Sequence, residues 1–262
     1  MTHQDPARSF GTAVDAYDRG RPGYPDDAVD WALSHAPDRA PAAHVPQRAR
    51  AAGADASDRL RVLDLGAGTG KLTASLVARG LDVTAVEPDE AMRGRLVELL
   101  PSVRALPGTA EEIPLPDSSV ELVTMAQAWH WVDPERASAE VARVLVPGGV
   151  VALVWNIRDE SVPWVRRLGE VAGSSPAERF ETLRPPLGAA LERRAFAAFD
   201  WVHEMTREAL QDVFASRSYV IALPEPERAA VLAAVSGNVD GLPGERIGMP
   251  YATRVTIAGR AG

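Results

Sequence analysis

A short glycine-rich segment constrains this chain more tightly than any other feature. The segment is Asp64-Leu65-Gly66-Ala67-Gly68-Thr69-Gly70, and it closes an apolar run over residues 60–65. Residues 71–79 follow with apolar side chains at helical spacing. Glycines between a strand and a helix let the backbone take positive φ and approach a ligand closely. The segment therefore predicts a ligand site at the carboxyl end of a strand, where open α/β sheets bind ligands.

Strands and helices alternate regularly after this segment. Further strands are predicted at residues 81–86, 103–106, 120–126, 150–155, 199–205 and 251–258. Helices are predicted at residues 10–35 in two pieces, 89–100, from the Asp133-Pro134 start to about 145, 162–172, 207–216 and 225–235. Such alternation implies right-handed crossovers. The fold class is therefore α/β, a doubly wound, Rossmann-like, mostly parallel sheet with helices on both faces.

Composition removes several classes of protein. The chain has 262 residues and no cysteine, which excludes disulfides, thiolate metal sites and cysteine nucleophiles. Its formal charge of −8 argues against a broad basic face for nucleic acid. No apolar signal segment opens the sequence, and its longest apolar stretch is too short to span a bilayer. We therefore expect a cytoplasmic protein without nucleic acid or membrane partners.

The chain divides into three parts by pattern. Residues 1–59 hold predicted helices, the loop Arg21-Pro22-Gly23-Tyr24-Pro25 and an aperiodic linker rich in alanine, proline and arginine. Residues 60–156 carry the regular strand–helix alternation and form the predicted cofactor-binding core. Residues 157–262 are less regular, and we expect them to complete the sheet and to cover the substrate pocket.

The spacing of the glycines separates two classes of cofactor. A dinucleotide fold requires G-x-G-x-x-G, whose third glycine packs the helix on the strand. Here Lys71 occupies that third place, which disfavours an oxidoreductase. Glu87 ends the second predicted strand, 17 positions after Gly70. A carboxylate there can accept hydrogen bonds from both hydroxyls of a ribose.

The pattern D-L-G-x-G-x-G resembles the first motif of the class I S-adenosylmethionine-dependent methyltransferases. Three further stretches carry the same resemblance: Arg143-Val144-Leu145-Val146-Pro147-Gly148-Gly149, residues 108–116 and Ala126-Gln127-Ala128-Trp129-His130-Trp131. The last stretch and residues 21–25 are similar to elements of type 11-like small-molecule methyltransferases in the trans-aconitate methyltransferase group. The resemblance implies a seven-stranded sheet whose last strand is antiparallel, with S-adenosylmethionine as methyl donor and S-adenosylhomocysteine as product.

Residue by residue, the resemblance assigns a cofactor site. Its predicted members are Tyr17, Arg21, Asp64, Gly66, Ala67, Gly68, Gly70, Glu87, Met92, Thr109, Ala110, Glu111 and Gln127. Thr109 departs from the family, because many relatives have aspartate there to accept from the adenine amino group. In this chain, either the Thr109 hydroxyl or the backbone around Ala110 and Glu111 is expected to accept the hydrogen bond from the adenine amino group.

His130 is the predicted catalytic residue, because an imidazole can accept a proton near neutral pH. The alternatives are that it orients an anionic substrate or packs between its neighbouring tryptophans. The predicted substrate-binding residues are Tyr24, Trp129, Trp131 and Trp155. The histidines show no ligand spacing, so we expect no metal; Asp133 and Asn156 are the weakest of candidates for magnesium.

These features together predict transfer of a methyl group to a small organic acceptor, at a carboxylate, hydroxyl or phenol oxygen. Two alternatives stay open: a cofactor-binding regulator without catalysis, and a methyltransferase for nucleic acid or protein. The amino-group nucleic-acid enzymes carry D/N-P-P-Y/F after the fourth strand, where this chain has Gln127-Ala128-Trp129-His130. The oligomer is predicted to be a monomer or a homodimer.

Overall fold

The computed structural model describes residues 21–37, 59–172 and 184–262 of the chain. Its strands are β1 (Arg61–Leu65), β2 (Asp82–Val86), β3 (Arg104–Leu106), β4 (Val120–Ala126), β5 (Leu145–Arg158), β6 (Leu191–Thr206) and β7 (Arg246–Arg260). Its helices are α2 (Asp26–Leu33), α3 (Lys71–Ala78), α4 (Glu90–Leu99), the 3₁₀ turn η4 (Trp129–Trp131), α5 (Pro134–Val144), α6 (Pro163–Ala172), α8 (Arg207–Ala215), α9 (Ser218–Ile221) and α10 (Glu225–Val239).

The strands form one sheet in the order β3-β2-β1-β4-β5-β7-β6. The pairs among β1 to β5 are parallel, while β7 pairs antiparallel with both β5 and β6. The strand order reverses between β1 and β4, which is where doubly wound sheets bind ligands. The predicted fold class is confirmed, including the seven strands and the antiparallel last strand.

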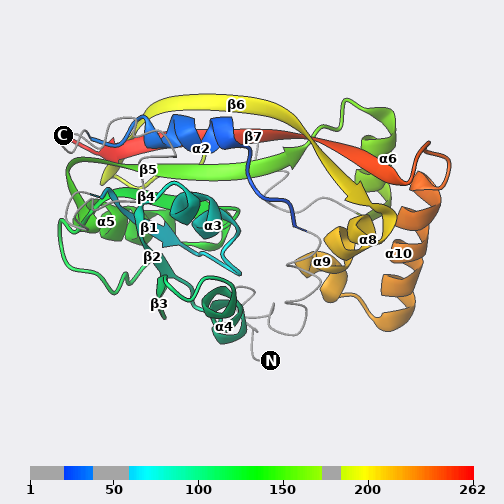
Figure 1. Cartoon of the computed structure of the whole chain (residues 1–262), viewed down its shortest axis with the longest axis horizontal. Coiled ribbons are helices and arrows are strands. Elements are labelled where there is room, and N and C mark those ends of the chain that lie inside the picture. The colour runs from blue at the N-terminus through cyan, green and yellow to red at the C-terminus, as the bar shows by residue number, and fades with distance from the viewer. Residues whose placement is uncertain (1–20, 38–58, 173–183) are drawn as a thin grey trace.

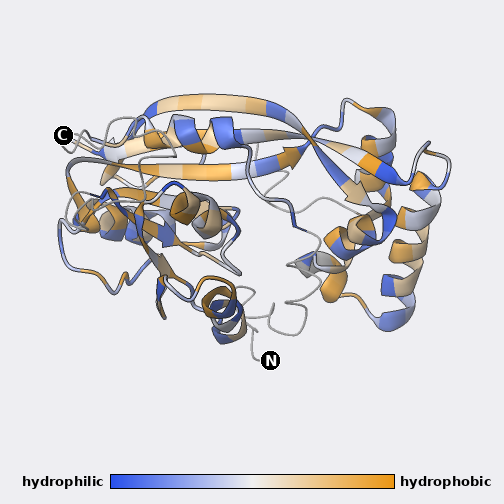
Figure 2. Ribbon diagram, viewed as in Figure 1, coloured by the Kyte–Doolittle hydropathy of each residue, from blue (hydrophilic) through white to orange (hydrophobic). Residues whose placement is uncertain are grey.

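Two apolar cores hold helices against the two faces of the sheet. Successive side chains of a strand point to opposite faces, so neighbouring residues of β1 serve different cores. Val62 joins the core shared with α2 and α3, whereas Leu63 joins the core shared with α5. Figure 2 shows that β5 is hydrophobic along most of the sheet, as expected for a strand covered on both faces.

The strands β6 and β7 run 16 and 15 residues and extend beyond the rest of the sheet. At their far ends lie α6, α8, α9 and α10, which Figure 1 shows as a separate group of helices beside the sheet. We call these helices with the far ends of β6 and β7 the helical body. Its own apolar core is built from Val165, Leu168, Ala172, Met205, Leu210, Val213, Phe214, Val235, Val239, Ile247, Met249 and Tyr251.

Local residues mark where the helices begin and end. Asp89 accepts a hydrogen bond from the Met92 backbone N–H, and Asp133 accepts from the N–H groups of Glu135 and Arg136, so both aspartates cap their helices. Gly80 ends α3 with a φ of 75°. In the part of the chain that the structure describes, no helix is long and apolar enough to cross a membrane.

Several predicted bounds were wrong. β5 begins at Leu145 instead of 150, and β6 and β7 are far longer than the predicted 199–205 and 251–258. The short turns η4 and α9 were not predicted. Of the N-terminal helices predicted over 10–35, the described residues contain α2; residues 10–20 and most of the aperiodic linker before β1 lie outside the described residues.

Candidate active site

The glycine loop joins β1 to α3 in a conformation that depends on glycine. Gly66, Gly68 and Gly70 have φ values of 67°, 58° and 90°, all in the left-handed region. The N–H groups of Gly66 and Ala67 donate to the Val86 carbonyl at 2.8 and 3.2 Å, which ties the loop to the end of β2. A Cβ on Gly66 would lie 3.0 Å from the Ala128 Cβ, so a side chain there would fill the space beside the loop.

Glu87 lies directly beneath the loop at the end of β2. One carboxylate oxygen accepts from the Gly68 N–H at 2.8 Å, and the other accepts from the Asp89 N–H at 2.9 Å. Burial raises the pKa of Glu87 to about 7, against the opposing effect of these two hydrogen bonds. A carboxylate has about four acceptor positions, so two remain for ligand hydroxyls.

Asp64 joins three elements from the end of β1. Its carboxylate accepts from the Thr73 hydroxyl of α3 at 2.6 Å and from the Thr124 hydroxyl of β4 at 2.9 Å. Burial raises the pKa of Asp64 to about 6, and the two threonine hydrogen bonds oppose the rise. Asp64 therefore fixes the start of the loop relative to α3 and β4.

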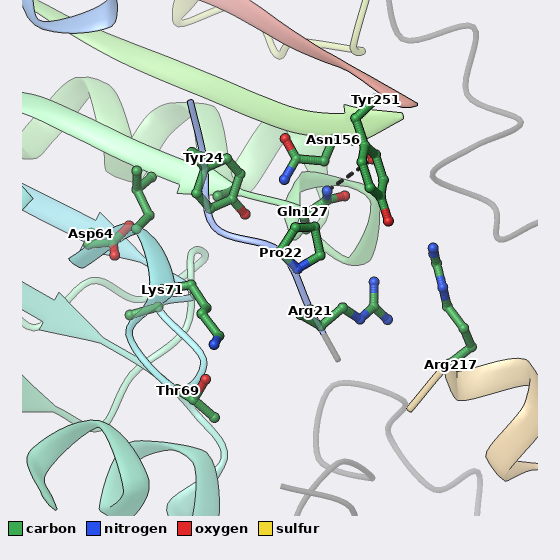
Figure 3. A pocket seen from close by; sticks show the side chains of 14 residues that line it. Arg21, Pro22, Tyr24, Asp64, Thr69, Lys71, Gln127, Asn156, Arg217 and Tyr251 are labelled. Atoms are coloured by element: carbon green, nitrogen blue, oxygen red, sulfur yellow. Dashed lines mark hydrogen bonds between the residues drawn. The ribbon is translucent and has the colours of Figure 1, made fainter. Parts of the chain in front are cut away.

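A pocket opens from the glycine loop toward the helical body (Figure 3). Its lining residues are Arg21, Pro22, Tyr24, Asp64, Gly66, Ala67, Thr69, Lys71, Leu72, Ala126, Gln127, Asn156, Arg217 and Tyr251. Of the predicted site residues, the pocket brings together Arg21, Tyr24, Asp64, Gly66, Ala67 and Gln127.

Gln127 occupies a strained position just after β4. Its φ of 56° lies in the left-handed region, although it is not a glycine. The backbone N–H donates to the Val154 carbonyl at 2.9 Å, and the side-chain amide donates to the Asn156 carbonyl at 3.2 Å. Strain of this kind gathers at functional sites, where surrounding contacts hold it.

The residues predicted on the adenine side, Met92, Thr109, Ala110 and Glu111, do not line this pocket. Met92 and Ala110 are buried in the apolar interior. Thr109 bridges to Glu112, and the Glu111 carboxylate accepts from the Asp133 N–H at 2.9 Å. Gly68 and Gly70 are likewise absent from the pocket lining, and Tyr17 lies outside the described residues.

His130 lies in η4, half-buried beside Trp131, with ring centroids 4.6 Å apart. Its Nδ1 is buried and has no hydrogen-bond partner among the described residues. Burial, and then the positive charge of Arg21, lower the pKa of His130 to about 4. The imidazole is therefore neutral at physiological pH, and it lies close enough to Arg21 for the positive charge of the arginine to lower its pKa.

The three tryptophans predicted to bind substrate do not line the pocket. Trp129 and Trp155 are each 1% exposed and belong to the core on the α5 face. Trp129 donates its indole N–H to the Pro186 carbonyl at 2.7 Å, and Trp131 is exposed. Trp155 points away from the pocket because successive side chains of a strand point to opposite faces of the sheet. Its neighbour Asn156 points to the other face and lines the pocket.

Sequence reasoning missed the pocket residues that come from distant segments. Arg217 follows α8, and Tyr251 lies on β7 in register with Arg158 of β5. Asn156 donates its amide to the Gly23 carbonyl at 2.9 Å and accepts from the Thr253 hydroxyl at 2.6 Å, which fixes the Arg21–Tyr24 segment over the pocket. No local pattern marks Arg217, since only the tertiary fold brings it to the loop.

Comparisons with known proteins agree on one family. A family model described as a methyltransferase domain matches residues 63–153. An uncharacterized methyltransferase of Mycobacterium tuberculosis is 46% identical over 98% of this chain and 99% of its own length. An uncharacterized methyltransferase-like protein of Schizosaccharomyces pombe is 32% identical over 88% of this chain and 86% of its own.

A solved structure gives the same result. A protein from Anaeromyxobacter dehalogenans, assigned as a type II methyltransferase, superposes with a TM-score of 0.65 at 28% identity, over 92% of this chain and 97% of its own. The glycine loop, the acid at the end of β2 and the sheet order fit this family. The chain therefore belongs to the class I S-adenosylmethionine-dependent methyltransferases.

Proposed function

We propose that this enzyme methylates a small organic molecule at an oxygen atom, in the pocket between the glycine loop and the helical body. The observation that carries the proposal is the shape of that pocket. It begins at Gly66 and Ala67, passes the end of β4 at Gln127 and ends at Arg217 and Tyr251. A methyl donor held at the loop would therefore present its methyl group to an acceptor held at the far end.

The loop residues fit S-adenosylmethionine, which supplies a methyl group on a positively charged sulfur. The positive-φ glycines leave open a cradle beside Ala128 that a Cβ would fill. Glu87 has acceptor capacity for the ribose hydroxyls beyond its two backbone hydrogen bonds. The start of α3 adds backbone N–H groups and a partial positive charge for the methionyl carboxylate.

The acceptor side has a different task. A sulfonium is already an activated leaving group, so the protein must mainly align the acceptor and exclude water. Alignment by itself can lower such a barrier by up to about 7–11 kcal/mol. We propose that the helical body covers the acceptor, and that Arg21, Tyr24 and Gln127 close the pocket from the sheet side.

Two experiments test this function. Calorimetry should show that S-adenosylmethionine binds and that NAD does not. Labelled S-adenosylmethionine should then transfer its methyl group to a member of a panel of small acids, phenols and amines. NAD binding more tightly than S-adenosylmethionine would contradict the cofactor. Cofactor binding with transfer only to RNA, DNA or protein, or with no transfer at all, would contradict the small-molecule acceptor.

A further inference from the structure

A chain of hydrogen bonds crosses three strands and ends at the pocket. The Trp201 indole N–H on β6 donates to the Thr253 hydroxyl on β7 at 2.8 Å, and that hydroxyl donates to Asn156 Oδ1 on β5 at 2.6 Å. The Asn156 Nδ2 then donates to the Gly23 carbonyl at 2.9 Å. Gly23 lies in residues 21–24, which we call the closing segment, and its neighbours in that segment line the pocket together with Asn156.

The two ends of this chain determine its direction. The Trp201 indole N–H can only donate, whereas the Gly23 carbonyl can only accept. The Thr253 hydroxyl therefore accepts from the indole and gives its single proton to the Asn156 oxygen. A reversed Asn156 amide would place its oxygen against the Gly23 carbonyl, which is a second acceptor. Trp201 and Thr253 thus fix which end of the Asn156 side chain faces the closing segment.

The same chain contacts the pocket wall at two further places. The Asn156 backbone carbonyl accepts from the Gln127 side-chain amide at 3.2 Å, drawn as a dashed line in Figure 3. Gln127 lines the pocket with a left-handed φ of 56°. The Trp201 ring stacks on that of Tyr251, a third lining residue, with centroids 5.5 Å apart and an angle of 26° between the planes.

Resting on the function proposed above, we infer that Trp201 and Thr253 are positioning residues for the acceptor pocket. Neither lines the pocket itself. They act through Asn156, whose side chain holds the closing segment and whose backbone holds Gln127. Because these groups close the pocket from the sheet side, a shift in them misaligns the acceptor against the methyl donor. Misplacement by about 1 Å can slow an aligned reaction by about 10²-fold.

β7 offers a matched pair of threonines for the test. Thr253 and Thr256 are 0% and 1% exposed on the same strand. The Thr253 hydroxyl makes two hydrogen bonds, whereas the Thr256 hydroxyl has no hydrogen-bond partner among the described residues. Valine has nearly the shape of threonine, so each Thr→Val change removes a hydroxyl and little else. The pair separates the hydrogen bonds of Thr253 from the burial of a threonine on this strand.

The experiment compares full-length Thr253→Val, Thr253→Ser and Thr256→Val with the wild type. Calorimetry measures the affinity for S-adenosylhomocysteine. Labelled S-adenosylmethionine measures kcat and KM on the acceptor identified from the panel of small acids, phenols and amines. NMR of the ligand-free proteins follows the Trp201 indole N–H and the backbone amides of Gly23 and Tyr24.

Thr253→Val should lower kcat/KM for the acceptor about 10- to 100-fold and change S-adenosylhomocysteine affinity by less than about threefold. Thr253→Ser should recover most of the loss, because serine keeps the hydroxyl. In Thr253→Val the Trp201 indole proton should exchange faster with solvent, and the Gly23 and Tyr24 amide signals should move. Thr256→Val should match the wild type in all of these measurements.

A double variant tests whether Thr253 acts through Asn156. Asn156→Leu removes both side-chain hydrogen bonds of the amide. Adding Thr253→Val to Asn156→Leu should then lower kcat/KM no further, whereas independent effects would multiply. If Asn156→Leu does not fold, the comparison of Thr253→Val with Thr253→Ser decides.

Three results would overturn the inference. The first is a Thr253→Val enzyme with a lower melting temperature and an unchanged kcat/KM, which would make the network structural alone. The second is an equal loss of S-adenosylhomocysteine affinity, which would assign the network to the cofactor. The third is losses that multiply in the double variant.

A different result would contradict the proposed function itself, namely wild-type protein that methylates no member of the panel. The NMR signals would then decide about the network. Gly23 and Tyr24 signals that move in Thr253→Val but not in Thr256→Val would still support its hold on the closing segment. Signals that stay in place would overturn the inference as well.

Discussion

The glycine-loop side of the pocket and the helical body face each other across it, yet they are assembled in different ways. The loop side comes from the continuous stretch β1, loop, α3 and β2, and Glu87 ends that stretch. The helical body gathers its core from α6, α8, α10 and the far ends of β6 and β7. In the function proposed above, the cofactor is bound by a compact local motif, whereas the acceptor side depends on segments that meet only in the tertiary fold.

The largest effect should come from breaking the helical body alone. Phe214 is fully buried in that body's core, and Arg158 lies over its ring at 5.0 Å. Phe214→Ala should cost about 3–5 kcal/mol of local stability, as truncation of buried aromatic residues does. Hydrogen exchange should show lost protection in α8 and α10 but not in β1 and α3. S-adenosylhomocysteine should still bind.

The control for this change is Phe196→Ala, because Phe196 is 38% exposed on β6 and its truncation should alter stability by less than about 0.5 kcal/mol. Equal loss of protection in β1 and in α8 would show that the two sides unfold as one unit. The contrast between the loop side, which is formed by one continuous stretch, and the helical body, which is formed by distant segments, would then fail.

The next effect is on the loop side. Glu87→Ala should weaken S-adenosylhomocysteine binding by about 1.5–3 kcal/mol, since the ribose loses a charged acceptor. Glu90→Ala, at an exposed position in the first turn of α4, is the control. An unchanged dissociation constant, measured by calorimetry, would remove Glu87 from the cofactor site.

A smaller effect is expected at His130. The imidazole is neutral above about pH 4, so lowering the pH from 8 to 6 does not protonate it. His130→Ala should lower turnover less than about tenfold, well short of the 10²–10⁴-fold that loss of a general base costs. Arg21→Ala should instead raise the Michaelis constant of the acceptor. A loss near 10³-fold at His130, with a pH-dependent rate, would indicate a hydroxyl or phenol acceptor.

The smallest effect concerns stability without ligand. The folded-state pKa of Glu87 is raised to about 7, so between its ordinary value and 7 the folded protein binds the proton more tightly than the unfolded chain. Wild-type stability therefore falls as pH rises through that window. Glu87→Gln should avoid the loss and gain about 1 kcal/mol at pH 8, after the cost of one altered backbone hydrogen bond.

Melting temperatures of the two cofactor-free proteins at pH 8 and pH 5 measure this gain. It should show as a rise of a few degrees at pH 8 that shrinks at pH 5, where the Glu87 carboxyl is protonated in the fold. A difference that does not depend on pH would mean that the buried carboxylate is not the source. Cofactor binding should weaken in the variant, which separates the stability of the loop side from its function.

Local patterns were enough to predict most of the sheet-side structure. β4 has the predicted bounds, and Asp89 and Asp133 cap the predicted helices, because each feature depends on residues within one turn or one strand. The glycine spacing with Glu87 likewise predicted the family, which the comparisons confirm.

Features that depend on distant contacts were not predictable in the same way. The length of β6 was missed because β6 is an edge strand that pairs, among the described strands, with β7 alone, and its exposed polar residues such as Arg193 and Glu204 interrupt the apolar pattern. Trp155 was assigned to the pocket although strand parity turns it to the other face. Arg217 carries no local signal at all, since its position depends on how the helices of the helical body pack at the far ends of β6 and β7.

The place of β7 in the sheet has a consequence for how the enzyme is made. It is the last of the seven strands in sequence, yet it lies between β5 and β6, and among the described strands β6 pairs with β7 alone. During synthesis β6 and α8 to α10 leave the ribosome before that partner does. β6 therefore joins the sheet only once residues 246–260 have emerged, a long-range step of the kind that slows folding. The nascent chain can form its glycine loop early, but it gains the wall that carries Arg217 only after β7 has been synthesised.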